Sequence, residues 1–220
     1  MSFQQFFVSV LIILSSAVTG RAAWVFDFQS ATAISELDGQ GIATTTATDA
    51  GVTLTLNVTA AVNNTNTAVL NLGTSNGLGV DITNVNGQEN ANFIDDGRGT
   101  ESVEFAVASS TGTDTSVRLT GIGFGNLTSA QDEAMLEIAG VTTSVVQSDL
   151  MSGSLSLSQL LNIGDSFEIS HAEGNGFSIL SLTFEAAGVT PVPEPTTLVL
   201  IGLAGGGAAA LRRRKRQHAC

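Results

Sequence analysis

The sequence predicts an all-β protein whose single β-sandwich lies between an N-terminal signal peptide and a C-terminal transmembrane helix. Short runs of alternating apolar and polar residues recur through the middle of the chain, and a period of two is typical of half-buried strands. Segments rich in glycine and asparagine separate these runs at roughly ten-residue spacing, as they do in sandwiches. An uncharged apolar segment stands near each end of the 220 residues. We therefore expect a leader at 1–22, a domain at 23–188 and a C-terminal segment at 189–220.

The first 22 residues are expected to be a secretory signal peptide. Residues 6–18 are largely apolar, and the small residues Gly20 and Ala22 follow them. A hydrophobic stretch followed by small residues is typical of a leader with its cleavage site. The residues before it contain no lysine or arginine, which departs from the usual pattern. An uncleaved N-terminal anchor is the alternative.

The clearest strand of the middle region is expected at residues 51–62. Its even positions from Val52 to Val58 are apolar, and its odd positions carry threonine or asparagine, so one face is buried and the other is solvated. Phe177 and Ile179 lie in the opposite phase from Leu180, which predicts a β-bulge. Further strands are expected at residues 24–28, 103–107, 117–119, 167–169 and 180–184.

Helical patterns are few in this region. Residues 130–138 fit a helix, but Met135 to Ile138 fit a strand equally well. Residues 156–163 are expected to form one or two helical turns. Neither segment changes the predicted all-β class.

The C-terminal segment has three parts in a fixed order. Val192, Pro193, Glu194 and Pro195 come first, and the prolines can continue neither a helix nor a sheet. An uncharged apolar run at 196–211 could form a helix of about 24 Å, slightly short of a bilayer's hydrocarbon core. A basic cluster follows and would stop translocation and stay cytoplasmic. The cluster consists of Arg212, Arg213, Arg214, Lys215 and Arg216.

This combination resembles the PEP-CTERM sorting signal of bacterial exported proteins. The resemblance covers only the C-terminal segment, and it concerns sorting. It implies that an exosortase, a membrane transpeptidase-like enzyme, cuts near Pro193–Pro195. It also implies a protein that is anchored in the inner membrane before processing and then reaches the cell surface or an exopolysaccharide matrix. An ordinary single-pass tail anchor is the alternative.

The predicted domain is strongly acidic. Two of the eight basic residues and nineteen of the twenty acidic residues lie in residues 24–190, so this region has a net charge of −17. Such a surface repels nucleic acid. It suits either divalent cations or simple solubility. The single cysteine is Cys220, so the domain can contain neither a disulfide nor a thiolate metal site.

One acidic loop is a candidate calcium site. Residues 86–101 carry many side chains with oxygen atoms, and calcium takes six to eight oxygen ligands from such loops. We expect any ion to be held by Asp95, Asp96 and Glu101. The spacing matches no EF-hand, and a solvated loop with Asx-turns is the alternative. No other cofactor is expected.

No pattern in the sequence indicates an enzyme. His171 is the only histidine of the predicted domain, and the phase of its strand places it on the core-facing side. Carboxylate pairs such as Glu101 and Glu104 could hydrolyse glycosides, but chance pairs are expected among so many acids. No nucleophile elbow, histidine metal cluster or phosphate loop is present.

The domain also resembles, more weakly, the jelly-roll-like domains that precede PEP-CTERM tails. The matching pieces are residues 77–80, 93–105 and 177–184. Such domains are similar in outline to carbohydrate-binding sandwiches. We therefore expect an exported structural or adhesive protein with a possible exopolysaccharide partner. A sandwich-type glycoside hydrolase or lyase and a passive membrane-anchored surface protein are the alternatives.

Overall fold

A computed structural model describes residues 22–62, 68–82, 93–96, 99–112 and 115–187 of the chain. All the described residues belong to one compact unit, which ends at Ala187. The predicted leader and the predicted C-terminal segment lie outside the described residues. All the strands and helices that the structure describes belong to that compact unit.

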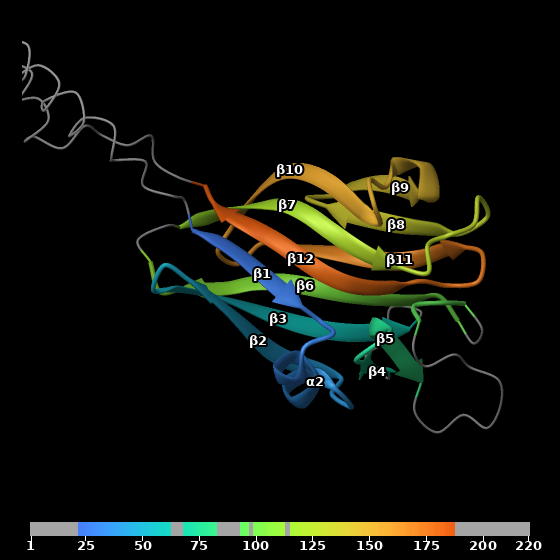
Figure 1. Ribbon diagram of the computed structural model, residues 1–220, viewed down its shortest axis with the longest axis horizontal. Coiled ribbons are helices and arrows are strands. Elements are labelled where there is room, and N and C mark those ends of the chain that lie inside the picture. Colours follow the sequence, from blue (N-terminus) through green and yellow to red (C-terminus); the bar gives the residue numbers. More distant parts are fainter. Residues whose placement is uncertain (1–21, 63–67, 83–92, 97–98, 113–114, 188–220) are drawn as a thin grey trace, which may run out of the picture. The chain divides into compact units, whose positions relative to one another are not determined.

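The described residues form two antiparallel sheets, as the all-β prediction requires (Figure 1). Sheet A has six strands in the order β10-β7-β12-β5-β4, and β1 also pairs with β12. Its strands are β1 (Ala23–Asp27), β4 (Ala68–Gly73), β5 (Gly77–Ile82), β7 (Ser116–Gly125), β10 (Ser154–Asn162) and β12 (Ser178–Ala186).

Sheet B also has six strands, in the order β2-β3-β6-β11-β8-β9. Strands β9 and β10 therefore form the edges of their two sheets, and a short 3-10 helix, η1 (Gln147–Asp149), connects them along the chain. The strands of sheet B are β2 (Ile42–Asp49), β3 (Val52–Val62), β6 (Glu101–Ser110), β8 (Glu133–Ile138), β9 (Val141–Val146) and β11 (Ser166–Glu173).

The core lies between the sheets and is built around phenylalanine rings. Phe105 of β6 stacks on Phe167 of β11, with 5.1 Å between ring centroids. The ring centroids of Phe167 and Phe184, which belongs to sheet A, lie 6.5 Å apart. Phe28, which follows the end of β1, also contacts the Phe105 ring. All four side chains are buried. Because every second residue of a strand faces the core, the alternation in the sequence places these rings in one layer.

One side of the two-sheet structure is covered by the N-terminal part of the domain. Helix α2 (Ala31–Leu37) packs beside β2 and β4, and Ser30 caps it by accepting a hydrogen bond from the N–H of Ala33. The indole of Trp24 on β1 donates to the Val52 carbonyl of sheet B at 2.9 Å. These contacts close the sheets at the β2 edge.

Several local predictions are settled by the structure. The predicted bulge is confirmed by a register shift between Ile179 and Ser181, and residues 133–138 form strand β8. The helical turns predicted for residues 156–163 are wrong, because this segment lies in β10 up to Asn162. Its leucines alternate with serines from Ser154 to Ser158, which gives the period of a strand. The finer likeness to a jelly roll stays a prediction.

Candidate functional site

The residues of the candidate sorting signal lie outside the described part of the chain. These are Val192, Pro193, Glu194, Pro195, Arg212, Arg213, Arg214, Lys215 and Arg216. The structure therefore tests neither their sorting role nor their stop-transfer role. The candidate calcium residues, in contrast, are described.

The calcium candidates lie where a loop enters strand β6. Glu101 begins the strand and is fully buried, Asp95 is 9% exposed, and Asp96 is exposed. One carboxylate oxygen of Glu101, Oε2, accepts a hydrogen bond of 2.9 Å from the backbone N–H of Asp95. The backbone N–H of Glu101 in turn donates to the Asp95 carbonyl at 3.1 Å. The two residues are thus joined by a reciprocal clasp that fixes the loop to the sheet.

The calcium site itself stays a prediction. Within the described ranges, no group of three or more histidine, cysteine, aspartate or glutamate side chains is placed to hold a metal ion. Residues 83–92 and 97–98, which carry further oxygen atoms of this loop, are not among the described residues. Of this loop, the structure describes the two hydrogen bonds that join Asp95 and Glu101.

His171 is packed in the core, on the side that its phase in the sequence predicts. It is 4% exposed and lies on β11 opposite Ala134 of β8. Its ring nitrogen Nε2 has no hydrogen-bond partner among the residues that the structure describes. A catalytic base needs a substrate within hydrogen-bond reach, and a side chain buried in this way is better suited to packing.

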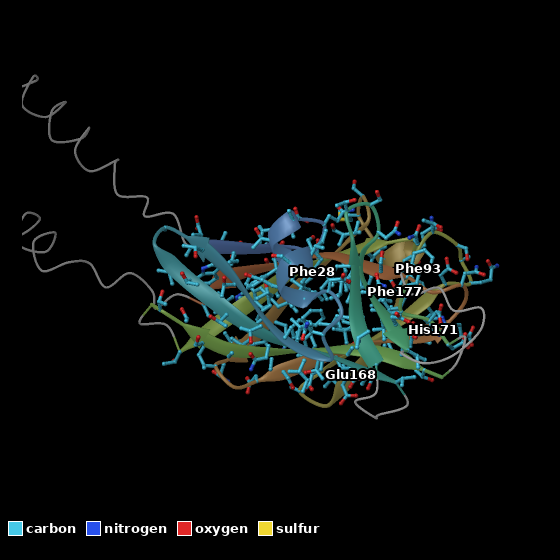
Figure 2. All side chains as sticks on the ribbon, turned by 90° about the horizontal axis from the view of Figure 1, so that it is seen from below. Phe28, Phe93, Glu168, His171 and Phe177 are labelled. Carbon is cyan, nitrogen blue, oxygen red and sulfur yellow. The ribbon has the colours of Figure 1, made fainter. Side chains whose placement is uncertain are left out.

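The outer face of sheet B carries a row of three glutamates that the sequence analysis did not single out. Glu104 of β6 lies directly opposite Glu168 of β11, and Glu168 lies directly opposite Glu137 of β8. Figure 2 labels Glu168, the middle member of the row. Like charges on directly opposed residues destabilise a sheet. We call these three residues the glutamate row.

Replacing Glu168 by glutamine is therefore expected to stabilise the domain. The change removes the middle charge of the glutamate row, so the free energy of unfolding should rise by about 0.5–1 kcal/mol, and more at low salt. Urea unfolding at two salt concentrations measures this. Glu185→Gln is the matched control, because Glu185 lies opposite Arg118 and its loss should give no gain. A Glu168→Gln domain that is less stable than wild type at low salt would contradict net repulsion within the row.

Asp132 ties two loops together at the end of the sheets. Its Oδ1 accepts from the backbone N–H of Asn175 at 3.1 Å, and its Oδ2 accepts from the N–H groups of Ser129 at 2.9 Å and Thr128 at 3.3 Å. Burial raises the pKa of the Asp132 carboxyl, but these hydrogen bonds outweigh burial and leave the pKa below its ordinary value of 3.8. The ionised form therefore stabilises the folded state.

Asp132→Asn is expected to lower the free energy of unfolding at pH 7 by about 1–3 kcal/mol, because the amide cannot accept all these bonds. Since the folded-state pKa is lowered, the wild-type advantage is present above the unfolded pKa and is lost as the pH falls through the folded value. Urea unfolding at neutral pH and below about pH 4 should show the gap closing. Asp96→Asn, on an exposed residue, is the control. An equal gap at both pH values would contradict the role of the charge.

A groove of about 520 Å³ opens between the edges of the two sheets, at the side opposite β2. Its apolar floor includes Leu136 and Val145 of sheet B and Leu155 and Leu157 of sheet A. Hydroxyl and amide groups line the rim, for example Thr143 and Gln159. This size and lining fall within the range of ligand-binding clefts. Sequence reasoning missed the groove, because it depends on β9 and β10 being edge strands of different sheets.

Comparison with known proteins identifies the C-terminal segment. Residues 191–215 match the PEP-CTERM protein-sorting motif. The chain carries a PEP-CTERM sorting motif. This confirms the resemblance seen in the sequence and marks an exported protein that an exosortase processes at the membrane. The match covers Pro193, Glu194 and Pro195 and ends at Lys215, one residue before the end of the basic cluster.

A search of curated proteins found no sequence that matches the chain. Among the residues that the structure describes, no helix is both long enough and apolar enough to cross a membrane. The predicted membrane segment at 196–211 lies outside those residues.

Proposed function

We propose that this PEP-CTERM protein is a non-catalytic structural or adhesive protein of the cell surface or the exopolysaccharide matrix, and that its β domain binds neutral carbohydrate. The observation that carries the proposal is the sorting motif at residues 191–215, joined to an all-β domain. An exported chain with this motif leaves the cytoplasm, and the matrix is the polymer that it meets there.

The polar groups described in the domain support a binding role over a catalytic one. Asp132 and Glu101 accept backbone hydrogen bonds that hold loops, and His171 is buried in the core. The groove between β9 and β10, in contrast, is open and is lined by hydroxyl and amide groups above an aliphatic floor. Asp149 is the single charged residue among the described residues that line it, so an anionic polymer would gain little there.

The experiment is a carbohydrate array probed with residues 22–187, with and without Ca²⁺. These residues contain the whole described core, from Trp24 to Ala186. Binding to neutral glycans that weakens on Leu157→Asp in the groove would support the proposal. Ser156→Asp, at an exposed residue of β10 outside the groove lining, is the control. Release of sugars from an array would favour a glycoside hydrolase or lyase. Absence of binding and of cleavage would favour a passive anchored protein.

The location is tested separately. Antibody against the domain should label intact cells and the secreted matrix of the exporting host. Signal confined to the inner membrane would contradict the surface assignment, although it would leave the sorting motif in place.

A further inference from the structure

The groove between β9 and β10 is an uncovered part of the core-facing side of sheet B. Val141 and Thr143 of β9 lie opposite Ile138 and Leu136 of β8, and directly opposed residues share one face of a sheet. Leu136 and Ile138 belong to the buried core, so this face is the core side. Val141 is nevertheless 65% exposed, and Thr143 is exposed as well. The edge of sheet A therefore leaves this part of β9 open.

The floor of the groove is aliphatic. Leu155 and Leu157 of β10 are half-buried and line it from sheet A. Every apolar residue in the described lining is alanine, valine, leucine or isoleucine, and none is aromatic. The lining thus lacks the flat ring on which the face of a sugar could stack. It is better suited to a small apolar group such as a methyl, which gains from contact with each surrounding carbon atom.

Polar groups beside this floor argue against a ligand made of hydrocarbon alone. The hydroxyl of Thr143 and the amide of Gln159 both line the groove. A hydrocarbon chain would remove water from them without replacing its hydrogen bonds, which is costly. An unsubstituted hexose has the opposite fault, because hydroxyl groups on every side would press on Leu155 and Leu157. A fitting ligand presents an apolar group to the floor and hydroxyl groups to the rim.

The charges around the groove disfavour an anionic ligand. Asp149 is charged and lines the groove at the η1 end, where its Oδ2 accepts from the N–H of Val146 at 3.0 Å. Glu137 of β8 is exposed, and it points to the opposite face of the sheet from Leu136 because neighbouring side chains alternate. A uronic acid or a sulfated sugar would meet the like charge of Asp149. A neutral sugar meets no such repulsion.

We propose that the groove binds neutral sugars through a methyl group that lies on the aliphatic floor. This rests on the function proposed above and narrows its ligand class. The methyl is that of a 6-deoxy hexose or that of an acetyl substituent, two sources of the same chemistry. It packs against Leu155 and Leu157, while hydroxyl groups of the sugar exchange hydrogen bonds with Thr143 and Gln159.

Matched pairs of sugars on the carbohydrate array of residues 22–187 test the methyl contact. L-Fucose against L-galactose and L-rhamnose against L-mannose differ only by the 6-deoxy methyl. N-acetylglucosamine against glucose tests the acetyl source. The member with the methyl should bind at about a fourfold lower half-saturating concentration, which is the effect of burying one such group.

Two substitutions separate the methyl contact from the polar contacts. Leu157→Ser removes part of the floor and should bring the ratio within each pair close to one; Leu155→Ser is the second variant of this kind. Thr143→Val keeps the shape of the side chain and removes its hydroxyl, so it should weaken both members of a pair by about fivefold and leave their ratio unchanged. Ser156→Asn, at an exposed residue of β10 outside the groove lining, should change neither value. The thermal transition of each variant shows that it is folded.

Each outcome bears on the methyl contact. A preference in the 6-deoxy pairs alone or in the acetyl pair alone supports it and identifies the source of the methyl. Equal binding within every pair, or tighter binding of the members without the methyl, would overturn it and leave carbohydrate binding standing. A preference that persists in the folded Leu157→Ser and Leu155→Ser domains would also overturn it, because the methyl would then lie elsewhere. Binding of no glycan would overturn both this contact and the carbohydrate function.

Discussion

Replacing Pro193, Glu194 and Pro195 together by alanine is expected to stop processing of the chain while the domain folds unchanged. The sorting motif spans residues 191–215, and proline gives its start a fixed φ and removes backbone donors. Alanine frees φ, restores the backbone N–H groups and removes the carboxylate of Glu194. An enzyme that recognises the rigid Pro-Glu-Pro segment therefore loses the features that it binds. An immunoblot of the chain in a host with exosortase should show the precursor only, where wild type shows the processed form.

The same triple variant should leave the domain's free energy of unfolding within about 0.5 kcal/mol. The three residues lie beyond Ala186, where the last strand ends. Alanine at Val189 and Thr190, just outside the motif, is the matched control and should be processed normally. Normal processing of the triple variant would contradict a sorting role for these residues.

The fold class could be predicted because alternation alone decides which side chains face the core. Val103, Phe105 and Val107 were expected on one face of a strand, and all three are buried in β6. Edge strands gave weaker signals. Strand β9 reads VTTSVV, and its β-branched residues favour a strand, but four of its six residues are exposed, so no alternation of apolar and polar residues marks it. Pairing with β8, which no local pattern encodes, makes it a strand.

Burial of polar residues was predicted from the sequence at one position and not at another. Glu101 was treated as a loop ligand, although it lies in phase with Val103 and Phe105 and is fully buried. The same alternation correctly placed His171 in the core. The hydrogen bond from the Asp95 N–H offsets part of the cost of burying the Glu101 carboxylate. Phase within a strand was the better guide at both positions.

Phe105→Ala is expected to cost about 3–5 kcal/mol of unfolding free energy, the usual range for a fully buried phenylalanine. Phe105 lies near the middle of β6, a central strand of sheet B, and is 0% exposed. Its ring stacks on Phe167 at 5.1 Å and contacts Phe28 at 5.9 Å, so alanine leaves a cavity bordered by two aromatic rings. Such a loss is a large part of a domain's typical stability of about 5–15 kcal/mol.

Urea unfolding of residues 22–187 measures the change, and two further variants separate cavity formation from other causes. Phe105→Leu keeps most of the volume, so the cost should fall well below that of alanine. Val25→Ala shortens a side chain that is 57% exposed and should change stability by no more than about 0.5 kcal/mol. Equal losses for Phe105→Ala and Val25→Ala would mean that the layer of rings between the sheets is not the main source of the domain's stability. A large loss for alanine with a small one for leucine would place that source in the contacts of Phe105 with Phe28 and Phe167.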